Sequence, residues 1–435
     1  MQAHAEIRLW GTRIAAVSHD ARNGVAQFEY DREFRQSGIE LSPITMPLAD
    51  QVYRFPELAR ESFHGLPGLL ADALPDKFGN ALIDAWLSSR GRTSESFNPV
   101  ERLCYIGKRG MGALEFSPTC GPRPRKSERI EIQEMVGLAS QILQHRSQLE
   151  TRFGTPESGD TLKEILRVGT SAGGARAKAI IAWHPDSGEV RSGQVEAPEG
   201  FGYWLLKFDG VRGNRDKEAA DPQGYGRIEY AYSLMAKAAG IEMTDCRLLE
   251  EGGRAHFMTR RFDRLPDGSK LHMQTLGGLA HFDYNMAGAY SYEQAMQLMR
   301  QLKLGMDARL QQFRRMTFNI IARNQDDHVK NIAFLMDKRG QWRLSPAYDL
   351  IYSYNPDGAW TNRHKMTVNG KRDHFTRTDL EACAEAAMIP LKWIQPILHE
   401  VADAVRNWRD YADQANVGAS SRDRIQQTLR LDLPA

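Results

Sequence analysis

The segment NQDDHVKN, residues 324–331, gathers acidic, amide, histidine and lysine side chains in eight consecutive positions. It comes at the end of residues 307–325, in which apolar residues recur at helical spacing. A buried helix is therefore predicted to lead into the segment. The following residues read as two short strands around a turn at 337–340, with Asp349 just beyond the second strand. Because a hairpin brings its two ends together, we expect Asn331 and Asp349 to lie close to each other.

Oxygen ligands in this arrangement suit magnesium, which proteins usually hold through one or two side chains together with substrate phosphates. In protein kinases an Asn and a later Asp hold the metal, while an Asp five residues before that Asn accepts the proton of the substrate hydroxyl. Asp326 stands five positions before Asn331. We therefore predict Asp326 as the catalytic base and Asn331 and Asp349 as metal ligands. Asp327 is predicted to be a structural acceptor, and His328 a hydrogen-bonding scaffold of the loop, because magnesium sites favour oxygen.

Phosphoryl transfer also needs a fixed positive charge near the phosphates. The alternation in YWLLKFD places Lys207 on one strand face with Tyr203 and Leu205, so an ammonium group is embedded in an apolar strand. An embedded lysine is costly unless it is paired or used. We predict that Lys207 contacts the nucleotide and that Glu229, near the start of the next helix, is its partner.

A glycine-rich backbone loop for phosphate oxygens is predicted in VGTSAGGARAK, residues 168–178. It lacks the GK[ST] ending of a Walker motif. A second glycine cluster, GKRGMGALEF at 107–116, is assigned to turns that pack the N-terminal domain. The residues predicted to bind the nucleotide here are Ser171, Ala172, Gly173 and Gly174.

The order of segments predicts an α+β fold of the protein-kinase type, with a small β-rich N-lobe, an extra N-terminal α+β subdomain and a mostly helical C-lobe. Residues 6–55 read as a small sheet, residues 177–209 as a hairpin with a neighbouring strand, and residues 256–276 as a further hairpin. Beyond residue 290 the pattern is mainly helical, apart from 332–351. The predicted domains are the N-terminal subdomain 1–120, a linker and helix 121–150, the N-lobe-like region 151–285 and the helical C-lobe 286–435.

Net charge, cysteine spacing and hydropathy argue against several classes of protein. A formal net charge of +2 gives no domain-wide basic footprint, so direct nucleic-acid binding is unsupported. The four cysteines lie far apart without a CxxC pair, which argues against a disulfide framework and a zinc site. No window approaches the roughly 20 apolar residues of a membrane span, and the first residues are unlike a signal peptide. We expect a cytoplasmic protein that does not bind membranes.

The sequence resembles the HipA-type toxin kinases of bacterial HipBA toxin–antitoxin systems over nearly its whole length. The resemblance implies an ATP- and Mg²⁺-dependent serine/threonine protein kinase in which Asp326, Asn331, Asp349 and Lys207 take the roles given above. It also implies autophosphorylation at Ser171 as an off-switch, a HipB-like helix-turn-helix antitoxin, DNA contact made mainly through that partner, and a substrate such as an aminoacyl-tRNA synthetase or another translation component. The matching motifs are LPGLLADALPDKFG, GALEF, SAGGARAK, YWLLKFD, RRFDR, DDHVKN, LSPAYDL and MTVNGKRDHFT.

Two alternatives stay open. The phosphate-handling residues do not reveal which hydroxyl enters the site, so a small-molecule phosphotransferase is the second enzymatic reading. The third is a catalytically silent module that binds an antitoxin or regulates DNA. In addition, Arg176 and Ala177 depart from the Gln and Glu common in the family, which leaves the predicted switch at Ser171 open.

Overall fold

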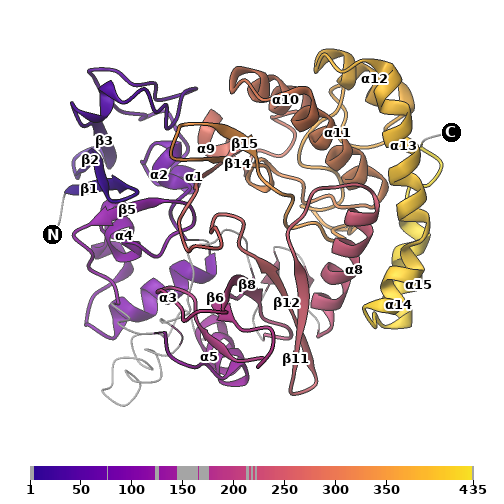
Figure 1. The fold of residues 1–435 in the computed structure, drawn as a ribbon, viewed down its shortest axis with the longest axis horizontal. Coiled ribbons are helices and arrows are strands. Elements are labelled where there is room, and N and C mark those ends of the chain that lie inside the picture. The colour runs from indigo at the N-terminus through magenta and orange to yellow at the C-terminus, as the bar shows by residue number, and fades with distance from the viewer. Residues whose placement is uncertain are drawn as a thin grey trace. The chain divides into compact units, whose positions relative to one another are not determined.

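The computed structural model describes residues 4–75, 77–122, 127–144, 165, 176–211, 215–216, 219–220 and 223–433 (Figure 1). The chain divides into two compact units. The first unit comprises Met1–Gln223, Leu249–Gln274 and Leu335–Gln341, and the second comprises Gly224–Leu248, Thr275–Phe334 and Trp342–Ala435. The domain limits drawn from the sequence stay predictions.

The first unit begins with the predicted small sheet, which is antiparallel throughout and has the order β4-β3-β2-β1-β5. Apolar residues alternate along its strands, so that Ile7 and Phe28 are fully buried on the core face. A capping box between Asn98 and Glu101 starts α4, which packs against β1 and β2. The elements are β1 His4–Leu9, β2 Thr12–Asp20, β3 Val25–Tyr30, β4 Val52–Tyr53, α1 Arg60–Phe63, α2 Gly68–Ala71, α3 Lys77–Ser88, α4 Pro99–Ile106, β5 Leu114–Ser117 and α5 Ile132–Gln144.

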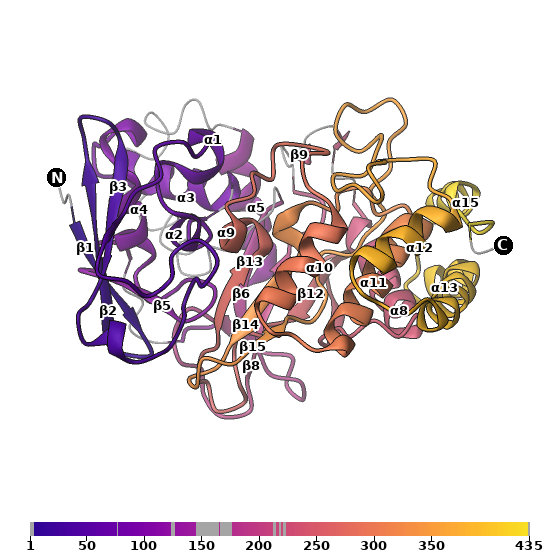
Figure 2. The ribbon, with the colours of Figure 1, turned by 90° about the horizontal axis from the view of Figure 1, so that it is seen from above.

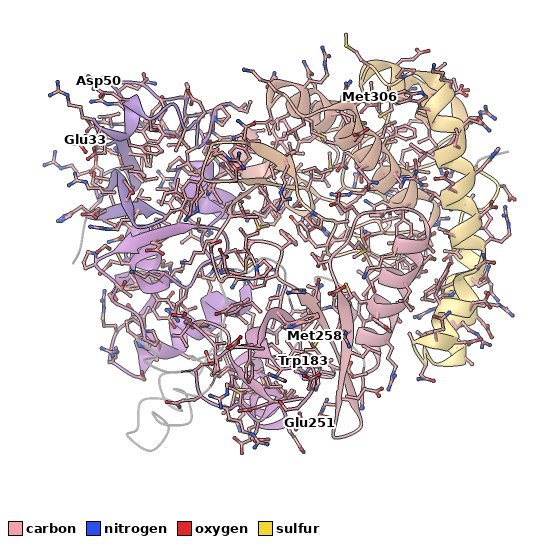
Figure 3. All side chains as sticks on the ribbon, in the orientation of Figure 1. Glu33, Asp50, Trp183, Glu251, Met258 and Met306 are labelled. Atoms are coloured by element: carbon pink, nitrogen blue, oxygen red, sulfur yellow. The ribbon has the colours of Figure 1, made fainter. Side chains whose placement is uncertain are left out.

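A second five-stranded sheet has the order β11-β12-β8-β6-β7, and the predicted hairpin and neighbouring strand at 177–209 are confirmed as β6, β7 and β8. Trp204 and Leu206 of β8 point into a core shared with α3 and α5. Met258 of β12 belongs to the same core, and Trp183 of β6 packs against it (Figure 3). The strands are β6 Lys178–Trp183, β7 Val190–Ser192, β8 Gly202–Lys207, β11 Cys246–Glu251 and β12 Arg254–Arg260, and a small separate pair joins β9 Arg215–Asp216 to β10 Ala219–Ala220.

The hairpin predicted for residues 256–276 is confirmed next to its turn, where Arg264 and Lys270 form an antiparallel bridge, but not farther out along the two strands. A tight turn is present, since Leu265 N donates to Ser269 O at 2.9 Å. However, β12 pairs with β8, whereas β13, His272–Thr275, belongs to the three-stranded sheet β13-β14-β15. The pairing across the turn ends with Leu271 N, which donates to Asp263 O at 3.0 Å.

The second unit is mainly helical. α11 packs against α10 and α13, and α13 also packs against α8 (Figure 2). α13 is in contact with α14 as well. Just after α8, Gly240 has a φ of +75°, a left-handed conformation that glycine adopts readily at the end of a helix. The helices are α8 Tyr225–Ala238, α9 Leu276–Ala280, α10 Tyr292–Gln301, α11 Met306–Ile321, α12 Arg377–Ala386, α13 Leu391–Arg406, α14 Trp408–Gln414 and α15 Ala419–Thr428.

The predicted hairpin after residue 331 is confirmed as β14, Ala333–Met336, and β15, Trp342–Leu344. The helical pattern expected beyond residue 351 begins later than predicted, because α12 starts at Arg377. The intervening residues carry the turn sequences NPDG and NG, which favour irregular backbone. Sheets and helices that segregate along the chain make the fold α+β, as predicted. Within the described residues, no helix has both the length and the apolar surface that a bilayer crossing requires.

Candidate functional site

The polar loop, defined as residues 324–331, lies in the second unit just beyond the end of α11 at Ile321. Inside it, His328 N donates to Asp326 O at 3.0 Å, and Asn331 N donates to His328 O at 2.8 Å. The side chain of Asn331 closes the same turn, since its Nδ2 donates to Asp326 O at 2.8 Å. The predicted base and one predicted metal ligand are therefore neighbours within one hydrogen-bonded turn.

The carboxylate of Asp326 is held by an aromatic residue far along the chain. Trp360 Nε1 donates to Asp326 Oδ1 at 2.6 Å. Above the ring of Trp360, Lys365 Nζ lies 3.8 Å from the centroid, within the range of a cation–π interaction. A cation, an indole ring and a carboxylate thus form one continuous assembly.

Asp327 is buried and accepts three hydrogen bonds, in agreement with its predicted role as a structural acceptor. Tyr292 Oη donates to Oδ2 at 2.8 Å, His364 Nδ1 lies 2.8 Å from the same oxygen, and Lys365 N donates to Oδ1 at 2.7 Å. Burial, with the Asp327 charge adding to it, raises the pKa of Tyr292 well above its ordinary value, so its hydroxyl stays a donor at neutral pH. These three hydrogen bonds to Asp327 fix the polar loop to the surrounding residues of the second unit.

The tautomer of His364 follows from its second contact. Arg430 Nη1 lies 3.1 Å from His364 Nε2, and a guanidinium group can only donate. Nε2 must therefore accept, which places the ring proton on Nδ1 and makes His364 a neutral donor to Asp327.

Asp349 follows the hairpin, and its neighbours are tied to the polar loop at two points. Tyr348 Oη donates to Lys330 O at 2.5 Å. On the other side, Ser353 N donates to Arg323 O at 3.1 Å, just before the loop begins. Asp349 itself has a φ of +57°, a left-handed conformation that is uncommon for a residue other than glycine and is found more often at functional sites.

His328 and Lys330 both lie near the ring of Tyr284. The His328 ring centroid is 5.8 Å from that of Tyr284, and Lys330 Nζ is 4.7 Å from the Tyr284 centroid. With its backbone hydrogen bonds, His328 acts as a scaffold of the loop, as its sequence context predicts.

The donor set fits a hard cation such as Mg²⁺. Because Nδ2 of Asn331 donates within the turn, its Oδ1 is the acceptor end of the amide, and Asp349 supplies a carboxylate. In the part of the chain that the structure describes, no group of three or more His, Cys, Asp or Glu side chains could hold a metal. The two oxygen donors match the pattern in which substrate phosphates complete the coordination.

Lys207 and Glu229 lie in different units, Lys207 on β8 and Glu229 on α8. Lys207 is half-buried, with Nζ 5.8 Å from the centroid of Phe257, and Lys178 is its directly opposite partner on β6. Glu229 is buried at 1% exposure. Their predicted ion pair stays a prediction.

The glycine-rich loop falls largely outside the described residues. Of the segment 168–178, Arg176 and Ala177 are buried where the chain enters β6, and Phe208 N donates to Ala177 O at 3.0 Å. The predicted nucleotide contacts that lie outside the described residues are Ser171, Ala172, Gly173 and Gly174.

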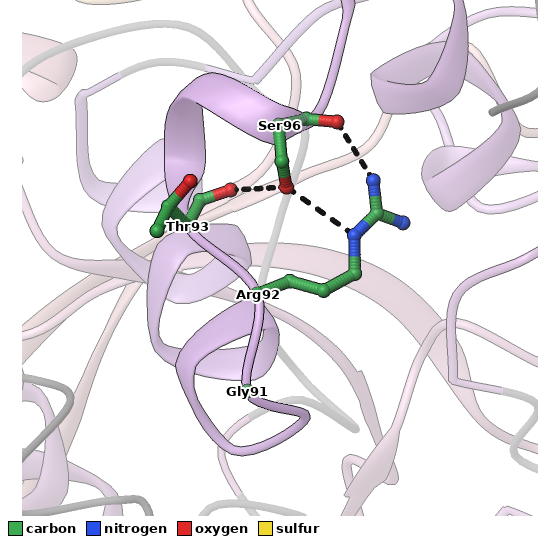
Figure 4. A pocket seen from close by; sticks show the side chains of 4 residues that line it. All are labelled: Gly91, Arg92, Thr93 and Ser96. Carbon is green, nitrogen blue, oxygen red and sulfur yellow. Dashed lines mark hydrogen bonds between the residues drawn. The ribbon is translucent and has the colours of Figure 1, made fainter.

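A pocket in the first unit is lined by Gly91, Arg92, Thr93 and Ser96 and contains none of the predicted site residues (Figure 4). Arg92 Nη2 donates to Ser96 O at 2.7 Å, and Ser96 Oγ donates to Thr93 O at 2.7 Å. These bonds stabilise the turn after α3, which accounts for the polar lining.

The second glycine cluster also has a structural role. Gly112 N donates to Asp263 Oδ2 at 2.7 Å, and Arg264 donates to the carbonyls of Gly110 and Gly112. A Cβ atom on Gly112 would lie 2.9 Å from Met273 N, so the close approach requires glycine. The turns at 107–113 thus pack the N-terminal sheet, as predicted, and are held by the RRFDR motif.

Sequence reasoning did not single out Trp360, His364, Tyr292 or Arg430. The contacts of Trp360, Tyr292 and His364 with the polar loop span 34 to 37 positions, and Arg430 is linked to the loop through His364. The one available signal was the clustering of Trp, His, Lys and Arg within a segment that lacks helical or strand periodicity.

Two family models match the chain: that of the HipA N-terminal domain over residues 5–117, and that of the HipA-like C-terminal domain over residues 170–408. The fold is similar to a chain in the structure of the Shewanella oneidensis MR-1 toxin–antitoxin complex of HipA, HipB and operator DNA, with a TM-score of 0.67 and 18% identity, covering 97% of this chain and 95% of that chain. A Helicobacter pylori proinflammatory kinase, CtkA, gives a TM-score of only 0.34 at 11% identity, over 54% of this chain and 89% of that chain.

A Haemophilus influenzae protein provisionally named as a kinase is 26% identical over 136 residues. That alignment covers 28% of this chain and 40% of the Haemophilus protein, so it spans less than half of the relative's length. The predicted α+β architecture is confirmed, and the chain shares the fold of the Shewanella structure. Because the C-terminal family model alone spans more than half of the 435 residues, the chain belongs to the HipA family.

Proposed function

We propose that this protein is the toxin of a toxin–antitoxin pair and a serine/threonine protein kinase that transfers the γ-phosphoryl group of ATP to a protein hydroxyl. The observation that carries the proposal is the turn in which Asn331 Nδ2 binds Asp326 O. That turn presents a carboxylate and an amide oxygen together, five positions apart, and Asp349 follows a residue that is tied to the same loop.

In this proposal Asp326 accepts the proton of the substrate hydroxyl, while the oxygen of that hydroxyl bonds to the γ-phosphorus. The bond between the γ-phosphorus and the bridging oxygen breaks, and its electron pair leaves with ADP. Asn331 and Asp349 would hold Mg²⁺, which when bound offsets the negative charge of the phosphates. Lys207, with Glu229 as partner, would add a fixed positive charge on the nucleotide side.

The glycine-rich loop would cradle the phosphates with Ser171, Ala172, Gly173 and Gly174. We propose that phosphorylation of Ser171 switches the enzyme off. A phosphate there carries a charge of about −1.5 to −2 at neutral pH and would occupy the place of the nucleotide's own phosphates.

For the partners, we propose a HipB-like helix-turn-helix antitoxin, supported by the fold shared with the HipA, HipB and operator DNA complex of Shewanella. The net charge of +2 supports DNA contact made mainly through that partner. The proposed substrate is an aminoacyl-tRNA synthetase or another component of translation, and the proposed location is the cytoplasm.

The test is transfer of label from [γ-³²P]ATP with Mg²⁺ into lysate proteins and, in parallel, into small metabolites. We expect labelled protein with the wild type and a loss of about 10²–10⁴-fold with Asp326→Asn. Asp357→Asn, which removes an exposed carboxylate, is the matched control and should keep full activity. Label confined to metabolites would favour the small-molecule phosphotransferase, and equal labelling by wild type and Asp326→Asn would refute the role of Asp326.

Phosphoproteomics of cells expressing the wild type beside Asp326→Asn would identify the substrate. Sites that appear only with the wild type should lie on serine or threonine of a translation component. A phosphate on Ser171 that is absent in Asp326→Asn would support the proposed off-switch, and its absence from both would contradict it.

A further inference from the structure

We infer that Trp360 is a positioning residue for the reaction, which holds the carboxylate of Asp326 through its indole N–H and is itself held by the ammonium group of Lys365. The inference rests on the proposed function, because it assigns a role relative to the proposed base.

Geometry supports this assembly. The indole edge meets Asp326 Oδ1 at 2.6 Å, which is short for an N–H donor and typical of a bond to an ionised acceptor. The ring face meets Lys365 Nζ at 3.8 Å. Lys365 is only 3% exposed, so its charge acts on the ring with little screening by water.

The cation strengthens the donor. An ammonium group over the ring face draws electron density from the indole, which makes the N–H more positive and a better donor to a carboxylate. Asp326 on the edge and Lys365 on the face therefore reinforce each other through the same ring. A phenylalanine would keep the interaction with Lys365 but could not bind Asp326.

The segment that carries Trp360 is fixed to the loop at further points. Lys365 N donates to Asp327 Oδ1 at 2.7 Å, and the neighbouring His364 ring lies 2.8 Å from Asp327 Oδ2. Residues 360–365 therefore form hydrogen bonds with the carboxylates of both Asp326 and Asp327. The hydrogen bond from the indole N–H to Oδ1 restricts rotation of the Asp326 carboxylate, so that in the proposed reaction Oδ2 would take the proton of the substrate hydroxyl.

The direct test is the indole N–H region of a ¹H–¹⁵N spectrum, in which eight tryptophans give eight signals. Trp360→Phe identifies the Trp360 signal. In Asp326→Asn we expect that signal to move upfield in the proton dimension more than any other, because the acceptor loses its charge. A Trp360 signal that does not respond to Asp326→Asn would overturn the inference, and this readout needs no activity.

The kinetic test compares Trp360→Phe with the control Trp393→Phe, whose side chain is 40% exposed on α13. We expect kcat to fall about tenfold with KM for ATP unchanged in Trp360→Phe, because a base that is poorly aligned slows transfer without weakening nucleotide binding. Trp393→Phe should match the wild type. A raised KM with unchanged kcat, or no kinetic change, would contradict a positioning role.

Lys365→Met provides a second variant if Trp360→Phe does not fold. It keeps the indole N–H and removes the cation, so a smaller loss of kcat and a smaller upfield movement of the Trp360 signal are expected. An unchanged signal in Lys365→Met would show that the cation does not strengthen the donor. A wild type that labels no protein would refute the proposed function, whereas the spectrum would still decide the hydrogen bond.

Discussion

Two aspartates, one in each unit, are equally buried but neutralised in opposite ways. Asp263 is 0% exposed and bound by two guanidinium groups, with Arg261 Nη2 at 2.7 Å and Arg264 Nη1 at 2.9 Å from Oδ2. Asp327 is 2% exposed and accepts from a tyrosine hydroxyl, a backbone N–H and the neutral ring of His364. Asp263 is therefore paired with full positive charges, whereas Asp327 is bound by neutral hydrogen-bond donors.

The difference matches what each aspartate holds in place. Burial alone would raise the pKa of Asp263, but the charges of Arg261 and Arg264 hold it well below its usual range. That ion cluster fastens the glycine turns at 107–113 to the segment that follows β12. Neutral donors around Asp327 instead fix a loop beside Asp326 without adding another full positive charge there. Ion pairing stabilises the architecture around Asp263, and neutral hydrogen bonds fix the loop that carries the proposed base.

Asp263→Asn should give the largest effect on folding. Removing one partner of a buried ion cluster leaves two buried guanidinium groups without their counter-charge, so we expect the first unit to lose about 3–5 kcal/mol of unfolding free energy. Hydrogen exchange under increasing urea, followed by mass spectrometry, would localise the loss. The folded fraction should keep its rate of phosphoryl transfer.

The matched control for that variant is Asp50→Asn, because Asp50 pairs with Arg35 but its side chain is 85% exposed. An exposed pair contributes about 0–1 kcal/mol, so little change is expected. Equal losses from Asp263→Asn and Asp50→Asn would refute the assigned importance of the buried cluster.

Mild acid should weaken the first unit through two buried histidines. Burial lowers the pKa of His256 to about 4 and that of His272 to about 3. Below about pH 6.5 the unfolded chain binds protons that the folded chain does not, so stability is present above that pH and falls as the pH decreases. At pH 5 each histidine should cost about 2 kcal/mol.

Urea midpoints for the first unit at pH 7.5 and pH 5 would measure this loss. His272→Gln removes one of the two groups, so the difference between the two pH values should shrink by about half. A midpoint that is the same at both pH values in the wild type would contradict the prediction.

Asp327→Asn should affect the second unit and, unlike Asp263→Asn, should reduce activity as well. An amide cannot accept from all three donors with the strength of a carboxylate, so we expect a loss of about 1–3 kcal/mol, confined to the second unit. Because Asp326 is the adjacent residue, kcat should fall in the folded protein. If Asp327→Asn lowered stability but left kcat unchanged, the contrast between the two aspartates would lose its functional side.

The parts of the site that could be predicted are those set by local sequence. The spacing of Asp326 and Asn331 lies within one turn, and the hairpin that precedes Asp349 follows from two apolar runs and the turn at 337–340. Trp360 lies 34 positions from the aspartate that it binds, and no periodicity marks such a contact.

The hairpin was predicted only in part for the same reason. The turn at 265–269 was recognised, but a turn signal does not reveal how far the flanking strands pair with each other. Farther from the turn β12 pairs with β8 instead, and this pairing joins residues distant in sequence. Long-range pairing of this kind cannot be derived from one sequence.

Arg430→Met should give the smallest effect on stability and tests the hydrogen-bond relay behind Asp327. Arg430 reaches His364 Nε2 and also pairs with Asp373, while its backbone N donates to Ile321 O at 3.0 Å, a bond that the variant keeps. We expect a loss of about 1 kcal/mol. Burial lowers the pKa of Arg430 to about 10, so the group is still charged at neutral pH and still enforces an acceptor at Nε2.

The ¹⁵N chemical shifts of the His364 ring show directly which ring nitrogen carries the proton. In the wild type, Nε2 should show the shift of an unprotonated nitrogen and Nδ1 that of a protonated one. Without the guanidinium group, Nε2 loses the donor that fixes the tautomer, so the two ring shifts of Arg430→Met should move toward each other at neutral pH. The donor from Nδ1 to Asp327 would then be lost in part of the molecules. If kcat fell together with this change in the shifts, a fixed donor from His364 to Asp327 would be a requirement of the site; an unchanged kcat would mean that the loop tolerates either tautomer.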